Sequence, residues 1–217
     1  MKIIQKILVG FLALLFFSGA SVQQFFQSLH QSLLDEKWAV SVLERAWADV
    51  IYKLEEALKL VFPNAAKFEE EVRDLTLKQR AAIEKQASLT FHKEFDKKFT
   101  FYKGVAKDGV VLGYVGVSQV QGKWGAIEYA VGLNDYGEVT DVLVLNLTEK
   151  RGKPIREKKF LGQFSGKTIN DPLNLKKDIR GVAGASISSQ GMLDGVKKVL
   201  FVFNELYPVK EKPKDEE

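Results

Sequence analysis

The chain has 217 residues, a formal net charge of +4, 46% hydrophobic residues and no cysteine. This length fits one domain with a small addition, and the apolar fraction excludes a wholly disordered chain. The lack of cysteine excludes a disulfide scaffold, an iron–sulfur cluster and a thiolate nucleophile. Two histidines, His30 and His92, are too few and too far apart for a histidine metal site, so no metal is expected.

The basic residues do not form a stripe of one sign. The pI is about 9.0, but lysines and arginines alternate with acids along the chain, as in KLEEALK and KEFDKK. Nucleic-acid binding needs a one-sided basic surface. The sequence therefore predicts no nucleic-acid partner.

The N-terminal residues 1–20 follow the pattern of an export signal. Lys2 and Lys6 precede an apolar run from Ile7 to Phe17, and small residues follow up to Ala20. This order is typical of a signal peptide, and the run is short for a membrane-spanning helix. An uncleaved N-terminal membrane anchor is the alternative. Either interpretation predicts an exported protein, in the periplasm or at the outer face of the cytoplasmic membrane.

Residues 21–98 are expected to form a helical N-terminal section. Apolar residues recur at spacings of three and four over 35–62, which predicts a long amphipathic helix ended by Pro63. The charged segment 65–72 is expected to be a short helix. A further helix follows Leu75, because Thr76 and Gln79 fit a capping box.

The composition changes at residue 99, where valine, tyrosine, phenylalanine and glycine become frequent. Hairpin signals separate four expected strands, which predict an antiparallel meander. The strands are expected at about 100–106, 110–119, 124–132 and 138–146. Helices are expected at 157–164 and 190–206, before a charged, disordered tail at 208–217. The predicted fold class is α+β: an antiparallel, partly curled sheet flanked by helices, in a domain spanning 99–207.

The loop Arg180–Ser189 combines several features that suit a phosphate group. Glycines at 181 and 184 allow close backbone approach, and Ser186, Ser188 and Ser189 supply hydroxyls just before the last helix. A helix N-terminus offers free N–H groups and a partial positive charge. The alternative is a plain helix entry in which Ser188 or Ser189 is the N-cap.

The segment RGVAGASISS resembles the flavin-attachment motif of the FMN-binding domain family, roughly D-G-x-[ST]-G-A-T-x-[ST]-[ST]. That family includes the G subunit of the Rnf electron-transport complex and the C subunit of the sodium-pumping NADH:quinone reductase. The resemblance implies FMN as the cofactor, attached through its phosphate at the position of Ser186 by a dedicated flavin transferase. It spans about residues 60–206.

The chain departs from that motif at three positions: Arg180 replaces Asp, Ala183 replaces Ser or Thr, and Ser186 replaces Thr. Ser186 keeps a hydroxyl, so an ester is chemically feasible, but the loss of the acid at 180 weakens the case for covalent attachment. A guanidinium at 180 fits phosphate oxygens instead. The cofactor-binding residues implied by the loop and the resemblance are Arg180, Gly184, Ala185, Ser186, Ile187, Ser188, Ser189, Lys167 and Glu149.

The sequence therefore predicts an exported electron-transfer protein with one FMN, working with a redox partner protein or a membrane electron-transport complex. No acid–base set for a substrate is evident, which favours a carrier over a stand-alone enzyme. Two alternatives remain open: an exported binding or scaffold domain of the same fold without flavin, and a flavoenzyme for a small substrate.

Overall fold

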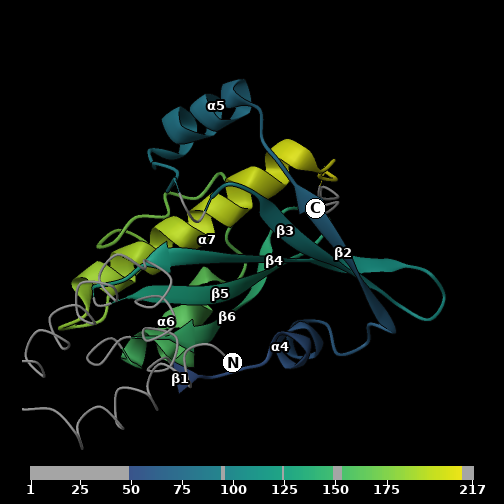
Figure 1. The fold of residues 1–217 in the computed structure, drawn as a ribbon, viewed down its shortest axis with the longest axis horizontal. Helices are drawn as coiled ribbons and strands as arrows, with labels where there is room; N and C mark the ends of the chain where they lie inside the picture. The colour runs from purple at the N-terminus through teal and green to yellow at the C-terminus, as the bar shows by residue number, and fades with distance from the viewer. Residues whose placement is uncertain (1–48, 94–95, 124, 149–152, 212–217) are drawn as a thin grey trace, which may run out of the picture. The chain divides into compact units, whose positions relative to one another are not determined.

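The computed structural model describes residues 49–93, 96–123, 125–148 and 153–211. They form a six-stranded antiparallel sheet in the order β1-β6-β5-β4-β3-β2, with helices on both faces (Figure 1). The predicted α+β class is confirmed. The expected signal segment 1–20 lies outside the described residues.

The four predicted strands of the meander are confirmed, each within about two residues of its expected ends. They are β3 (Phe99–Val105), β4 (Val111–Gln121), β5 (Ala126–Leu133) and β6 (Val139–Leu147). The turn between β5 and β6 shows why this sequence folds back. The Asn134 side chain accepts hydrogen bonds from the backbone N–H groups of Tyr136 and Glu138, and Gly137 adopts φ +69°.

The long helix α7 (Ser186–Leu206) covers one face of the sheet, chiefly over β4 and β5 (Figure 1). Its apolar side is buried in the larger hydrophobic core, and Tyr129 from β5 is fully buried beneath it. A Cβ added at Gly195 would lie 2.7 Å from the Tyr129 hydroxyl. Glycine is therefore required there for the helix to approach the sheet so closely.

The opposite face carries a smaller core under the helix α4 (Leu54–Val61). Its buried members are Ala57, Leu58, Phe62, Val115, Ala130 and Leu145. Because apolar side chains alternate between the two faces of each strand, this second layer uses the residues that do not contact α7. Within the described ranges, no helix is long and apolar enough to cross a membrane.

Two helix predictions in the N-terminal section are wrong. Residues 65–72 were expected to be helical, but Lys67–Arg73 form the edge strand β2, which pairs with β3. Pairing places Glu69 2.6 Å from Lys103 across the ladder, so cross-strand contacts outweigh the helix propensity of the glutamates. The predicted helix 35–62 reaches into the described part only as α4, because β1 (Asp49–Val50) pairs with β6 and α4 begins at Leu54.

The other predicted helices are confirmed with adjusted limits. The helix α5 (Leu77–Ala87) begins with the expected capping box between Thr76 and Gln79. The expected helix 157–164 consists of α6 (Lys158–Leu161) and the 3₁₀ turn η2 (Gly162–Phe164), after a first 3₁₀ turn, η1 (Lys153–Arg156).

Candidate functional site

The helix α7 begins earlier than the sequence suggested, and this changes the position of the loop serines. The helix was expected from Gln190, but its first residue is Ser186 and its N-cap is Ala185. The alternative with Ser188 or Ser189 as N-cap is therefore wrong. Alanine has no side-chain acceptor, so no side chain caps the first turn of α7.

A tight bend carries the chain into this helix. The N–H of Ala185 donates to the carbonyl of Val182 at 3.0 Å, and Gly184 adopts φ +77°. A Cβ at Gly184 would meet nothing within 4 Å, so its backbone conformation, and not crowding, is the reason for glycine at this position.

The three loop serines differ in exposure. Ser186 is exposed at the first helical position, whereas Ser188 and Ser189 are 1% and 0% exposed. The hydroxyl of Ser189 accepts a hydrogen bond from the N–H of Val182 at 3.0 Å, which ties the bend to the helix. Among these three serines, Ser186 alone presents a hydroxyl to solvent. Next to it, Ile187 exposes 55% of its surface.

Gln163 is a residue of this region that sequence reasoning missed. Its side-chain amide meets both backbone groups of Arg180: the N–H of Arg180 donates to Oε1 at 2.8 Å, and Nε2 donates to the carbonyl at 3.1 Å. Nε2 also lies 3.2 Å from the carbonyl of Phe160. Gln163 thus fixes the start of the loop to the end of α6. Nothing in the linear sequence relates positions 163 and 180.

Lys167 is held by carboxylates. Its ammonium lies 3.0 Å from Asp178 and 3.2 Å from Asp171, and these contacts raise its pKa, the hydrogen bond to Asp178 most strongly. Burial acts to raise the pKa of Asp178, but the backbone N–H of Asn174 and the ammonium of Lys167 outweigh it and lower the pKa. The ion pair between Lys167 and Asp178 therefore stabilises the segment before Arg180. Contact between Lys167 and a phosphate stays a prediction.

The remaining predicted site residues are Arg180, whose side chain is exposed, Ala185, which is buried, and Glu149, which lies outside the described residues. The structure thus brings together Arg180, Gly184, Ser186 and Ile187 on one exposed bend. Over the described ranges, no group of three histidines or acids is arranged to hold a metal ion.

Comparison with known proteins bears on this bend directly. The FMN-binding domain family matches residues 122–200, a segment that includes β5, β6, the bend and most of α7. The predicted resemblance is confirmed. FMN is accordingly the cofactor that the match supports, in agreement with the sequence prediction.

One curated relative extends the comparison. The G subunit of the ion-translocating oxidoreductase complex of Methanosarcina acetivorans is 32% identical over 101 residues, which are 44% of this chain and 54% of that protein. The chain thus spans about half the length of this relative. The crystal structure of NqrC from Shewanella oneidensis superposes with a TM-score of 0.44 and 14% identity, covering 70% of this chain and 89% of that one.

The exposed bend suits the phosphate of FMN. A dianionic phosphate needs donors and positive potential, and the uncapped N-terminus of α7 supplies both. The Ser186 hydroxyl stands at that helix end, and the absence of a side chain at Gly184 leaves the backbone open.

Proposed function

We propose that this chain is an FMN-binding electron carrier in which the start of α7 holds the flavin phosphate. The observation that supports this most is the exposed Ser186 hydroxyl at the uncapped first turn of α7, inside the segment that matches the FMN-binding domain. In this proposal the N–H groups of the first turn bind phosphate oxygens. Bound FMN supplies a ring that takes up one or two electrons.

Several residues of the chain have separate roles in binding FMN under this proposal. Gly184 allows the bend that aims the helix end outward, while Gln163 and Ser189 hold the backbone on either side of it. The exposed Arg180 side chain is available for a charge-assisted hydrogen bond to the phosphate. Ile187 offers an apolar surface beside the phosphate position, suited to contact with the ring or the ribityl chain.

We further propose that the flavin is esterified to Ser186. In that step a flavin pyrophosphate is the donor: the bond from Ser186 Oγ to phosphorus forms, the bond from phosphorus to the bridging oxygen breaks, and the departing phosphate monoester takes the serine proton. A flavin transferase catalyses the step. Exposure of Ser186 supports this choice, because a transferase must reach the hydroxyl, and Ser188 and Ser189 are buried.

The proposed setting of the carrier is supported by the sequence and by the relative. A signal-like segment at 1–20 favours export to the periplasm or to the outer face of the cytoplasmic membrane, cleaved or kept as an anchor. The relative is named as a component of an ion-translocating oxidoreductase complex. The proposed partner is accordingly a redox protein or a membrane electron-transport complex.

One observation favours a second candidate, a binding or scaffold domain of the same fold without flavin. Arg180, Ala183 and Ser186 depart from the attachment motif at three of its positions. A chain that binds no flavin would tolerate changes at these three positions. Ser188 and Ser189 would be retained in such a chain because both are buried in the fold.

The experiment is expression of the full chain with and without a flavin transferase. The proposal predicts a yellow protein whose flavin fluorescence stays with the denatured band only when the transferase is present, and is lost in Ser186→Ala. Ser165→Ala, at another exposed serine on a loop, is the matched control. A yellow native protein with a dark denatured band would refute the ester and keep FMN binding. A colourless protein under both conditions would leave the scaffold function.

A further inference from the structure

The alternation of basic and acidic residues that holds along most of the chain does not hold in the segment that leads into α7. Residues 153–180 contain eight basic and three acidic residues, a net charge of +5, whereas the whole chain has +4. The rest of the chain therefore carries a net charge of −1. We name the exposed members of this segment the basic surface. They are Lys153, Arg156, Lys158, Lys159, Lys176, Lys177 and Arg180.

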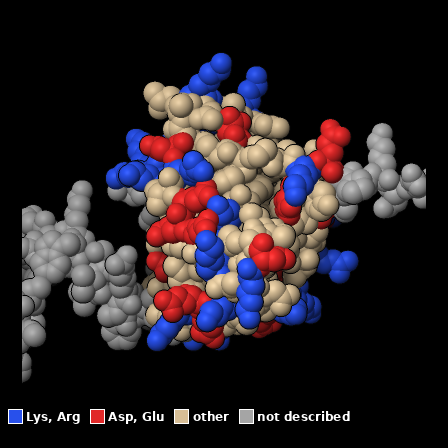
Figure 2. Space-filling view, turned by 90° about the vertical axis from the view of Figure 1, so that its right-hand side faces the viewer, with Lys and Arg blue, Asp and Glu red and all other residues tan. Residues whose placement is uncertain are grey.

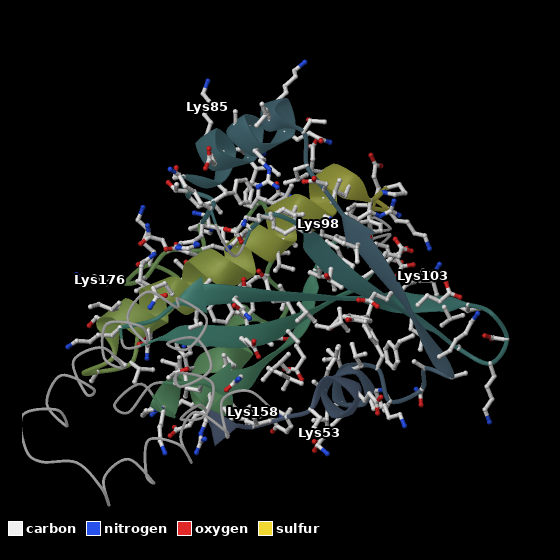
Figure 3. All side chains as sticks on the ribbon, viewed as in Figure 1. Lys53, Lys85, Lys98, Lys103, Lys158 and Lys176 are labelled. Atoms are coloured by element: carbon white, nitrogen blue, oxygen red, sulfur yellow. The ribbon has the colours of Figure 1, made fainter. Side chains whose placement is uncertain are left out.

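Contacts link α6 to the bend and the turn η1 to α7. Gln163 joins the backbone of Arg180 to the end of α6, whose first residues are Lys158 and Lys159. The turn η1 contacts α7 directly. Next to Lys176, the side chain of Leu175 lies 3.8 Å from where a Cβ at Gly181 would be. In Figure 3, Lys176 lies at the end of the molecule where α7 begins.

The charge at the opposite end of the molecule is balanced. Figure 2 shows basic and acidic side chains interleaved on the side where β2 and the β3–β4 hairpin lie. There, Lys103 lies 2.6 Å from Glu69 and 3.7 Å from Glu71, and Arg73 lies 2.7 Å from Glu71. An acidic partner would thus be attracted to the basic segment before Ser186. It would not be attracted to the side with β2, where the charges are paired.

We propose that the basic surface docks an acidic electron-transfer protein against the flavin. This inference rests on the proposed function, because the basic segment leads directly into the bend at which FMN would be held. Like-charged clusters that rim a reactive site raise the rate of encounter with an oppositely charged partner, and the effect falls with salt.

A protein partner fits this surface better than a lipid headgroup layer. Membrane-surface segments place aromatic or large apolar side chains among their basic residues. Here the two aromatic residues of the segment, Phe160 and Phe164, are 2% and 0% exposed and belong to the core. Glu157 and the ion-paired Asp178 also interrupt the basic residues, as suits complementarity with one partner surface.

The test uses the FMN-loaded full chain, reduced with dithionite and mixed in stopped flow with two oxidants of opposite charge. Ferricyanide stands for the acidic partner, and tris(phenanthroline)cobalt(III) is the cationic counterpart. The inference predicts that ferricyanide reoxidises the flavin faster at low salt, by on the order of tenfold over high salt. The cationic oxidant shows the reverse dependence.

Charge-removing variants show which lysines cause the salt dependence of the rate with ferricyanide. Lys158→Gln, Lys159→Gln, Lys176→Gln and Lys177→Gln combined should remove most of the salt dependence with ferricyanide. The matched control removes four exposed lysines elsewhere, at Lys59, Lys78, Lys85 and Lys107, and should keep it. Equal urea midpoints for both variants would exclude a folding effect, because these side chains are exposed.

Two results would overturn the inference. The first is a rate with ferricyanide that does not depend on salt, or that the control variant lowers equally. The second is sedimentation of the protein with vesicles of equal phosphatidylglycerol and phosphatidylcholine, lost in the four-lysine variant while its ferricyanide rate is unchanged, which would assign the surface to lipid. A preparation that takes up no flavin would instead refute the proposed function, before any rate is measured.

Discussion

Replacing Gln163 tests whether the bend must be held in place for flavin attachment. Gln163→Leu removes the hydrogen bonds to both backbone groups of Arg180 and to the carbonyl of Phe160. Neutral hydrogen bonds of this kind contribute about 0.5–1.5 kcal/mol each. Arg180 is exposed, so water replaces part of the loss, and the free energy of unfolding should fall by about 1–2 kcal/mol.

The effect on flavin attachment should exceed the effect on stability. The freed loop samples other positions of Ser186, so the rate of transferase-dependent flavin incorporation should drop by on the order of tenfold. Urea unfolding of the flavin-free chain measures stability, and fluorescence of the denatured band measures incorporation. Gln119→Leu is the matched control, because it removes an amide hydrogen bond to Glu128 on the face of the sheet away from α7.

Gln163→Glu tests the hydrogen bonds that position Arg180 while leaving the size of the side chain at 163 nearly unchanged. The carboxylate keeps the acceptor for the N–H of Arg180 but loses the donor to its carbonyl, so incorporation should be intermediate between the wild type and Gln163→Leu. The reasoning is refuted if Gln163→Leu incorporates flavin as fast as a Gln119→Leu chain of equal stability.

Three further perturbations test the surrounding structure. Gly184→Ala should cost about 1–2 kcal/mol of unfolding free energy and slow flavin incorporation, because the backbone there is left-handed; an unchanged urea midpoint would contradict this. Lys198→Met should cost about 3–5 kcal/mol, because it leaves the buried Asp96 carboxylate 2.6 Å away without its partner. Adding Asp96→Asn should restore most of that stability in a double-mutant cycle, and a purely additive loss would count against the pair. The lowered pKa of Asp178 stabilises the fold above the ordinary aspartate value of 3.8, and this contribution is lost as the pH falls through the folded-state pKa. The difference in unfolding free energy between wild type and Asp178→Asn should therefore be present at neutral pH and vanish in strong acid; a constant difference would exclude the Lys167 pair as its source.

The meander could be predicted from the sequence because its signals are local. Alternating apolar residues and turn residues such as Asn134 and Gly137 act within a few positions, and β3 to β6 follow them closely. The capping box at Thr76 is equally local. The edge strand β2 could not be predicted in this way. Its glutamates favour a helix by propensity, and only pairing with β3, about 30 residues away, makes them a strand.

The candidate site could be predicted only in part, because some of its features are local in the sequence and others depend on the folded chain. The loop motif placed Ser186 and its neighbours by composition, but the start of α7 was set four residues too late. Burial of Ser188 and Ser189 in the helix decides that limit, and burial is a tertiary property. The contact between Gln163 and Arg180 joins two segments with no sequence relation, so it appears only when the chain is folded.

Mass spectrometry of the tryptic peptide that follows Arg180 tests the central claim most directly. Cleavage after Arg180 and Lys197 releases one peptide with Ser186, Ser188 and Ser189. From full chain expressed with a flavin transferase, the account predicts this peptide with the added mass of one FMN less one water, and fragmentation that assigns it to Ser186. An unmodified peptide from a colourless protein, or flavin on any other peptide, would contradict it.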